Sequence, residues 1–195
     1  MYEVIGTRAS RAMRVLWMLE EAELPYTHVP AKPRDADAVA ANPSGKVPAL
    51  RDGAAVISDS VAIMAYLADK HGVLSAAAGT VARAQQDAMT LQILDDVDAI
   101  LWAAARHSFI LPQENRVPGL KDAMKWEYAR NLIQIEAAMQ GPFLMGDEIT
   151  LPDILLGHCL GWARVAKFPD PGVTLTAYHA QLRDRPAYLR AAALD

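Results

Sequence analysis

The sequence predicts an α/β domain followed by an all-α domain. Segments typical of strands and of helices alternate as far as Gly72, whereas beyond it strand signals disappear and helical periodicity continues almost to the last residue. The run of small residues at positions 76–79 is typical of a linker. We therefore expect an α/β domain over residues 1–75 and an all-helical domain over residues 80–195.

The first domain should hold a small sheet with helices on both faces. Its apolar runs end at Gly, Pro or polar turns, and Asp52-Gly53 between two of them is a hairpin signal. In order, the sequence predicts a strand at 2–5, a helix at 11–23, a strand at 26–29, a loop or short helix at 32–41, hairpin strands at 49–50 and 55–57, and a helix from 61 to about 72. A βαβ unit followed by ββα is the thioredoxin-like arrangement.

Long helices dominate the second domain. No Gly or Pro occurs between Thr80 and His107, and apolar residues recur there at three- and four-residue steps, which predicts one long amphipathic helix. We expect its solvated face to carry Asp95, Asp96 and Asp98. A second helix is predicted at 120–139, with Trp126, Ile133 and Ala137 buried, and short helices are predicted at 175–183 and 186–193.

Thr150 marks the start of another helix. Asp153 follows three residues later, Pro152 lies between them, and an apolar run comes after. This is a variant of the capping box, in which the side chains at the two positions satisfy each other's backbone N–H groups.

Composition excludes several classes of protein. The formal net charge is −4 and charged residues make up 22% of the chain, so no basic excess indicates a nucleic-acid partner. The single cysteine, Cys159, excludes an internal disulfide framework and any Cys-x-x-Cys pattern. No apolar stretch approaches the roughly 18 residues of a membrane span. We therefore expect a cytoplasmic protein that binds neither nucleic acid nor membrane.

A proline-containing turn is the first of two stretches that indicate a binding site. Pro43, Ser44 and Gly45 form turns, and the segment after them is strand-like except for Pro48, which donates no hydrogen bond to a sheet. A peptide bond before proline adopts the cis form at small cost. A cis bond here would turn the main-chain groups of Val47 outward, where they suit a peptide ligand.

The second stretch is the start of the helix at 61. Ser58, Asp59 and Ser60 are small polar residues of the kind that cap helices, and good helix formers follow them. The free N–H groups and the positive end of the dipole at such a position favour a carboxylate. This corner of the sheet therefore suits an anionic ligand.

Together the two stretches resemble the glutathione-binding half of the glutathione S-transferase family, in which an S-G-x-V-P turn and an [ED]-S-x-A-I helix start hold the tripeptide. The Thr150–Asp153 box resembles that family's [ST]-x-x-D box, so the resemblance covers nearly the whole chain. It implies a homodimer with a thioredoxin-like first domain. It also implies glutathione as co-substrate, no metal, and conjugation of the glutathione thiolate to small hydrophobic electrophiles.

The resemblance also implies roles for individual residues. Val47 would pair through its main chain with the cysteinyl part of glutathione, and Pro48 would hold the cis turn. Asp59 and Ser60 would bind the γ-glutamyl end. Lys46 and Arg11 are candidates for a glutathione carboxylate, although each could equally be a solvated surface residue.

Stabilising the thiolate needs a donor in the loop after the first strand. Lowering a thiol pKa from about 8.5 by two units takes about 2.7 kcal/mol of preferential interaction with the anion. The family places a Tyr, Ser or Cys donor in this loop. Here the candidates are Ser10, then Thr7, then Arg8, Arg11 or backbone N–H groups. Ser10 could instead be a plain helix cap.

The sequence says least about the pocket for the second substrate, the electrophile. The resemblance places the electrophile pocket near the end of the long helix, where Trp102, Arg106, His107 and Phe109 cluster. Aromatic residues at helical spacing also occur in hydrophobic cores, so the alternative is that these residues belong to the core of the helical domain. Two other functions stay open: a glutathione-dependent isomerase, dehalogenase or peroxidase using the same site, and a non-catalytic interaction module that has lost the donor.

Overall fold

The computed structural model describes residues 1–194, and these form two compact units. The first unit contains Met1–Thr80 together with the residues from Leu182 onward, and the second contains Val81–Gln181. In the division expected from the sequence, the C-terminal residues went with the helical domain. In the structure they group with the α/β unit.

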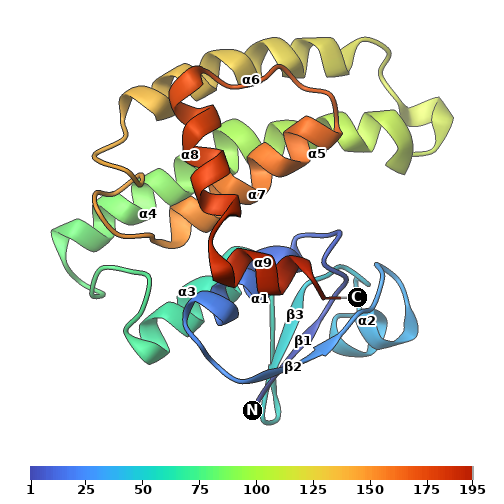
Figure 1. The fold of residues 1–195 in the computed structure, drawn as a ribbon. Coiled ribbons are helices and arrows are strands. Elements are labelled where there is room, and N and C mark those ends of the chain that lie inside the picture. Colours follow the sequence, from blue (N-terminus) through green and yellow to red (C-terminus); the bar gives the residue numbers. More distant parts are fainter. Residues whose placement is uncertain (195) are drawn as a thin grey trace. The chain divides into compact units, whose positions relative to one another are not determined.

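A four-stranded sheet forms the centre of the first unit (Figure 1). The strands are β1 (Tyr2–Ile5), β2 (Tyr26–Val29), β3 (Ala49–Asp52) and β4 (Ala55–Ser58), in the spatial order β2-β1-β3-β4. β1 is parallel to β2 and antiparallel to β3, and β3 is antiparallel to β4. The helices of this part are α1 (Ala12–Glu21), α2 (Ala36–Ala41) and α3 (Ser60–His71).

The register of the sheet assigns its buried residues to two faces. Ile5 pairs with Ala49, and both pack in one cluster with Ala38 and Ala41 of α2. Val4 pairs with Leu50 and, because side chains alternate along a strand, both point to the opposite face, where they are fully buried. α1 and α3, which contact each other, cover that face (Figure 1).

α1 is shorter than the sequence predicted. Its N-cap is Arg11 rather than Ser10, and it ends at Glu21 because Glu23 takes a left-handed backbone conformation with φ 53°. Every residue from Ala12 to Leu19 is buried. A helix buried on all of its faces needs a further partner besides the sheet and α3.

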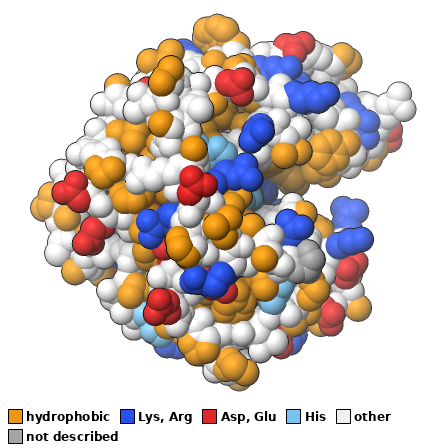
Figure 2. All heavy atoms as spheres, viewed as in Figure 1, with side chains coloured by type: hydrophobic (Ala, Val, Ile, Leu, Met, Phe, Trp, Pro, Cys, Tyr) orange, Lys and Arg blue, Asp and Glu red, His pale blue; other side chains and the backbone are white. Residues whose placement is uncertain are grey.

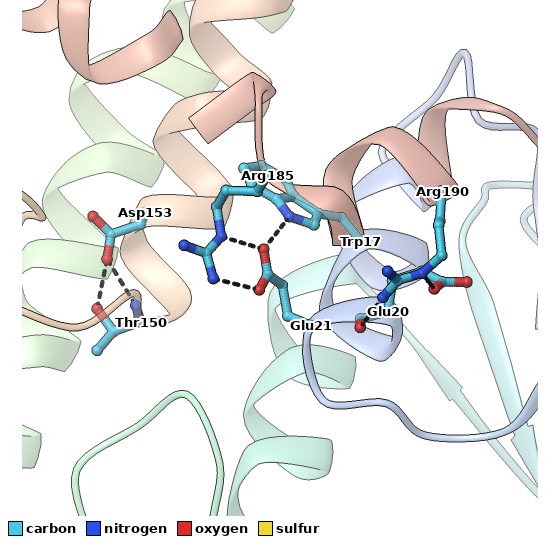
Figure 3. A network of polar contacts seen from close by, with 7 residues as sticks. All are labelled: Trp17, Glu20, Glu21, Thr150, Asp153, Arg185 and Arg190. Atoms are coloured by element: carbon cyan, nitrogen blue, oxygen red, sulfur yellow. Dashed lines mark hydrogen bonds and ion pairs between the residues drawn. The ribbon is translucent and has the colours of Figure 1, made fainter. Parts of the chain in front are cut away.

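That partner is the C-terminal helix α9 (Pro186–Ala192), which packs on α1. Arg185 donates from Nε and Nη2 to the two carboxylate oxygens of Glu21, at 2.6 and 2.7 Å (Figure 3). Arg190 donates from Nε to the Glu20 carboxylate and from Nη2 to the Glu20 carbonyl, and the rings of Trp17 and Tyr188 meet edge to face, 5.0 Å between centroids. Two arginines thus neutralise two glutamates at the negative end of the α1 dipole.

The second unit consists of helices. They are α4 (Val81–Ile93), a π-helical turn η1 (Leu94–Asp98), α5 (Ala99–Ala105), a second π-helical turn η2 (Arg106–Ile110), a short 3-10 turn η3 (Gln113–Asn115), α6 (Leu120–Ala137), α7 (Leu151–Val165) and α8 (Val173–Arg183), whose last residues cross into the first unit. Among the described residues, no helix has both the length and the apolarity to cross a bilayer.

Two predictions about buried faces were wrong. Trp126 and Ile133 are 66% and 68% exposed and Ala137 is exposed, whereas Tyr128, Leu132 and Ile135 fill the core. Both sets recur at helical spacing, so periodicity alone did not decide between them. Asp98, expected on the solvated face, is buried because the π-helical turn η1 adds a residue to one turn and shifts which side chains face inward.

The capping box at the start of α7 is present. Thr150 donates to Oδ2 of Asp153 from its backbone N and from Oγ1, each at 2.8 Å (Figure 3). Leu144 N and the Tyr178 hydroxyl donate to Oδ1, also at 2.8 Å. Burial raises the pKa of the Asp153 carboxyl above its ordinary value, and these four bonds work in the opposite direction. The carboxylate therefore joins three separate segments of the second unit.

We predict that Asp153→Asn destabilises the protein strongly despite its similar shape. Each carboxylate oxygen accepts from one backbone N–H and one hydroxyl, so either orientation of an amide directs its NH₂ group at a backbone N–H, which cannot accept. Leaving that N–H unsatisfied should lower the free energy of unfolding by about 1–3 kcal/mol, measured by urea denaturation. Asp122→Asn, at an exposed site in the first turn of α6, is the matched control and should change it little. Equal effects from the two variants would contradict this account.

Candidate functional site

Three segments of the first unit meet at one edge of its sheet. Ile5, Ala49 and Ser58 are aligned across β1, β3 and β4. The residues just beyond these positions are therefore neighbours: the loop 6–11, the turn 46–48, and the start of α3 at Asp59. This edge gathers the residues that the sequence associated with glutathione and with the thiolate.

A glycine allows the loop 6–11 to pass close to the turn. Gly6 has φ 144°, and a Cβ placed on it would lie 2.8 Å from Cβ of Ala12 and 3.1 Å from Cβ of Val47. The Val47–Pro48 peptide bond is cis, as the proline-containing turn suggested. Any larger residue at position 6 would push the loop away from the turn.

Asp59 caps α3 from an unusual backbone conformation. Its Oδ1 accepts from the N–H groups of Val61 and Ala62 at 2.8 and 3.1 Å, and its φ is 74°. A non-glycine residue with positive φ is strained, and such strain is often found at functional sites. The cap predicted from the Ser58-Asp59-Ser60 cluster is thus formed by Asp59.

Ser60 lies beneath this cap, only 2% exposed, and its hydroxyl oxygen accepts from Nη1 of Arg14 at 3.2 Å. Arg14 is itself 1% exposed, within the buried helix α1. Sequence reasoning missed Arg14 as a site residue. The available signal was a charged residue within the otherwise apolar run of that helix.

The Ser10 hydroxyl is engaged within its own loop. It donates to the carbonyl of Thr7 at 2.7 Å and accepts from the N–H of Ala12 at 3.1 Å. Thr7 Oγ1 accepts from Ala9 N at 3.5 Å. Ser10 therefore closes the turn that leads into α1, and its proton already has an acceptor.

Lys46 sits on a turn braced by an asparagine. Oδ1 of Asn42 accepts from the N–H and hydroxyl of Ser44, and Nδ2 of Asn42 donates to the carbonyl of Lys46 at 3.2 Å. The backbone at Lys46 is held by this bond while its side chain is exposed. The backbone of Lys46 is therefore fixed by the turn, and its charged side chain lies at the surface.

The four residues assigned to the electrophile pocket lie in the second unit. Trp102 belongs to α5 and is half-buried, whereas Arg106, His107 and Phe109 belong to η2, with Phe109 69% exposed. Nδ1 of His107 accepts from Val117 N at 3.1 Å, and Arg116 donates to the carbonyl of Phe109. These bonds tie the end of the long helix to the loop that follows it.

Comparison with known proteins identifies the class. The family model described as "Glutathione S-transferase, N-terminal domain" matches residues 10–70. Glutathione S-transferase GstB of Escherichia coli K12 is 29% identical, with 92% of this chain and 91% of that protein covered. A zeta-class glutathione S-transferase of Euphorbia esula is 30% identical, with 93% of this chain and 82% of that protein covered.

Solved structures agree with these relatives. The theta-class glutathione S-transferase of Xanthomonas axonopodis pv. citri, determined with glutathione bound, has a TM-score of 0.79 at 27% identity, covering all of this chain and 98% of the other. The chain belongs to the glutathione S-transferase family. The predicted fold, a thioredoxin-like α/β domain followed by an all-α domain, is confirmed.

We predict that Asp59→Ala destabilises the first unit more than Asp59→Asn. Alanine removes both cap bonds and must still accept a positive φ, so the free energy of unfolding should fall by about 1–3 kcal/mol. Asparagine keeps an acceptor oxygen and tolerates positive φ, so its effect should be smaller. Urea denaturation measures both. Equal losses in the two variants would show that the carboxylate charge, rather than the cap geometry, stabilises this helix start.

Proposed function

We propose that this protein conjugates the thiolate of glutathione to small hydrophobic electrophiles. The observation that carries the proposal is the start of α3, where the strained cap Asp59 and the buried Ser60–Arg14 pair adjoin the cis turn at Val47–Pro48. Family membership supports the same activity. A role in detoxification and a cytoplasmic location belong to this proposal, the location supported by a chain with one cysteine.

Glutathione binding follows from the donors at this edge. Ser60 accepts from Arg14, so its own proton points elsewhere and is available to the γ-glutamyl carboxylate, together with the N–H groups at the start of α3. The main chain of Val47, shaped by Pro48, would pair with the cysteinyl part. Lys46 and Arg11 would serve the glycyl carboxylate.

The thiolate stabiliser lies, in this proposal, among Ser10, Thr7 and Arg8. Ser10 would have to release the Thr7 carbonyl before its hydroxyl could donate to sulfur. Arg8 is exposed on the same loop and would act through its charge. The bond at Ser10 therefore shifts our preference toward Arg8 and Thr7. Trp102, Arg106, His107 and Phe109 are proposed to line the electrophile pocket.

Binding and turnover test the activity together. The purified protein should be retained on immobilised glutathione and should conjugate glutathione to chlorodinitrobenzene. Retention without turnover would favour the non-catalytic interaction module. Failure of both would contradict glutathione as co-substrate.

A pH profile with this neutral electrophile identifies the stabiliser. Its removal lets the pKa of the bound thiol rise toward about 8.5, so turnover near neutral pH should fall about tenfold for each unit of lost shift. The loss should shrink as the pH approaches that value, where the thiolate forms unaided. We expect Arg8→Gln or Thr7→Ala to move the profile, and Ser10→Ala to lower thermal stability without moving it. A shifted profile for Ser10→Ala would restore Ser10 as the donor.

We also propose a homodimer, supported by an apolar stripe on α6. Trp126, Ile133 and Ala137 lie on one face of this helix, all exposed, and the guanidinium of Arg130 stands 5.1 Å above the Trp126 ring. A second copy of the chain is the occupant expected from the family. Light scattering should give twice the 21.2 kDa of one chain, and Trp126→Glu with Ile133→Glu should give monomers. A wild-type monomer at micromolar concentration would contradict the proposal.

A further inference from the structure

His28 of β2 lies at a position where the sheet favours an apolar side chain. It is aligned with Val4 of β1, which is aligned in turn with Leu50 of β3, so all three side chains point to the face that α1 and α3 cover. Val4 and Leu50 are fully buried there, and His28 is half-buried. A polar ring among such residues is expected to have a hydrogen-bond partner.

That partner is the carbonyl oxygen of Gly6, 2.8 Å from Nε2 of His28. A carbonyl oxygen only accepts, so Nε2 carries the proton and donates in either charge state of the ring. The same peptide group is bonded at its other end, because the N–H of Thr7 donates to the carbonyl of Ala31 at 2.9 Å. The Gly6–Thr7 peptide is therefore held from both ends by β2 and the residues that follow it.

The glycine makes this double hold necessary. The close approach of the loop 6–11 to Ala12 leaves no room for a Cβ at position 6. A glycine, however, gives the backbone more freedom than any other residue, including rotation of the peptide that follows it. The bonds to His28 and Ala31 remove that freedom. They fix the direction of the Gly6 carbonyl, which carries a partial negative charge, and of the Thr7 N–H.

Further bonds extend this constraint along the loop 6–11. The carbonyl of Thr7 accepts from the N–H and the hydroxyl of Ser10, at 3.0 and 2.7 Å, and that hydroxyl accepts from the N–H of Ala12. The loop is thus a chain of bonded groups between His28 and the first turn of α1, with Arg8 inside it. The backbone that carries the three candidate thiolate stabilisers is therefore set in part by His28.

Surface charge does not replace such local control. Figure 2 shows Lys and Arg side chains (blue) and Asp and Glu side chains (red) interspersed with hydrophobic ones (orange) over one face of the molecule, and the formal net charge of the chain is −4. Exposed charges more than about 10 Å apart are largely screened from each other at about 0.1 M salt. Stabilisation of a thiolate therefore depends on groups that contact the sulfur.

We propose that His28 is a positioning residue for the thiolate of glutathione: through the Gly6 carbonyl it fixes the loop 6–11 in the conformation that brings the thiolate stabiliser against the sulfur. The inference rests on the proposed conjugation and adds to it a residue outside the loop. Most of the groups proposed to bind the tripeptide lie on α3 and the turn 46–48 rather than on this loop. Loss of the bond from His28 should therefore lower turnover at neutral pH more than it weakens glutathione binding.

Three variants of His28 test the proposal with chlorodinitrobenzene as the electrophile. Glutamine keeps an N–H donor at a similar reach, asparagine has the donor but is one carbon shorter, and leucine has none. His28→Leu and His28→Asn should lower kcat near pH 6.5 by about threefold to tenfold and move its pH profile upward, as expected when the pKa of the bound thiol rises by about half to one unit. His28→Gln should keep most of the wild-type rate.

Glutathione affinity separates positioning from binding. Calorimetry at about pH 5.5, where glutathione binds as the thiol, should give a dissociation constant that changes less than about twofold in all three variants. Hydrogen exchange supplies a readout of the loop itself. The amide protons of residues 7–10 should exchange faster in His28→Leu than in the wild-type protein.

His71→Leu is the matched control. Nε2 of His71 lies 2.8 Å from the hydroxyl of Tyr2, so this variant also loses a histidine hydrogen bond to β1, but at the opposite end of the strand from Gly6. It should change neither the pH profile, nor the affinity for glutathione, nor the exchange of residues 7–10.

Two results would overturn the inference and leave the proposed conjugation intact. One is a pH profile that is unchanged in His28→Leu and His28→Asn while the wild-type protein turns over. The other is an equal loss of kcat at every pH that His28→Gln does not restore, which would assign His28 to the stability of the sheet alone. If His28→Leu does not fold, His28→Asn, which keeps a polar side chain, decides the outcome. Absence of turnover by the wild-type protein would contradict the conjugation itself, and this inference with it.

Discussion

The burial of α1 is the constraint on which the first unit depends. A helix buried from Ala12 to Leu19 is ordinarily apolar, yet this one contains Arg14 inside and ends in Glu20 and Glu21. Removing a charge from water costs several kcal/mol unless hydrogen bonds and opposite charges compensate. The charged side chains near the two ends of α1 are compensated by different partners. Arg14 donates to Ser60 at the start of α3, and the glutamates bind arginines of the C-terminal segment.

This arrangement links the end of the chain to the sheet and helices of the first unit. The Glu21 side chain is only 6% exposed and receives two bonds from Arg185 and one from Nε1 of Trp17. A bidentate pair at a nearly buried carboxylate is worth more than an exposed ion pair, whose contribution is about 0–1 kcal/mol. α9 therefore closes the outer face of α1, while the inner face packs on the sheet. The loop 6–11 continues directly into α1, so its position depends on the packing of α1 against α9 and against the sheet.

Local sequence signals predicted most of the fold. The alternation of strand and helix patterns, the Asp52-Gly53 hairpin and the Thr150–Asp153 box each depend on residues close together in the chain, and each formed. The predictions that were wrong depend instead on contacts between residues far apart in the chain or on local backbone geometry that the sequence does not reveal. The choice of Tyr128 over Trp126 for the core of α6 depends on which helices pack against it, and the inward turn of Asp98 depends on a π-helical turn that has no simple sequence signature. The grouping of Arg185 with Glu21 joins residues 164 positions apart.

The same distinction between local and distant partners separates the site residues that the sequence revealed from the one that it did not. Pro48 and the cap at Asp59 were accessible from the sequence because turn and cap chemistry is local, and the structure has a cis bond and a capped helix there. Arg14 was missed because its partner is 46 residues away, and a lone arginine in an apolar helix does not reveal what it faces.

Ser10 shows that the right residue type at the right position does not establish a role. The sequence singled it out as a thiolate donor, but in the structure its hydroxyl donates to the Thr7 carbonyl of its own loop. A hydroxyl that closes the turn into α1 positions the loop whether or not it ever donates to sulfur. The groups proposed to bind the tripeptide are therefore positioned by α1 and α3, whereas the candidates for thiolate stabilisation lie on the short loop 6–11, which the Ser10 hydroxyl helps to close.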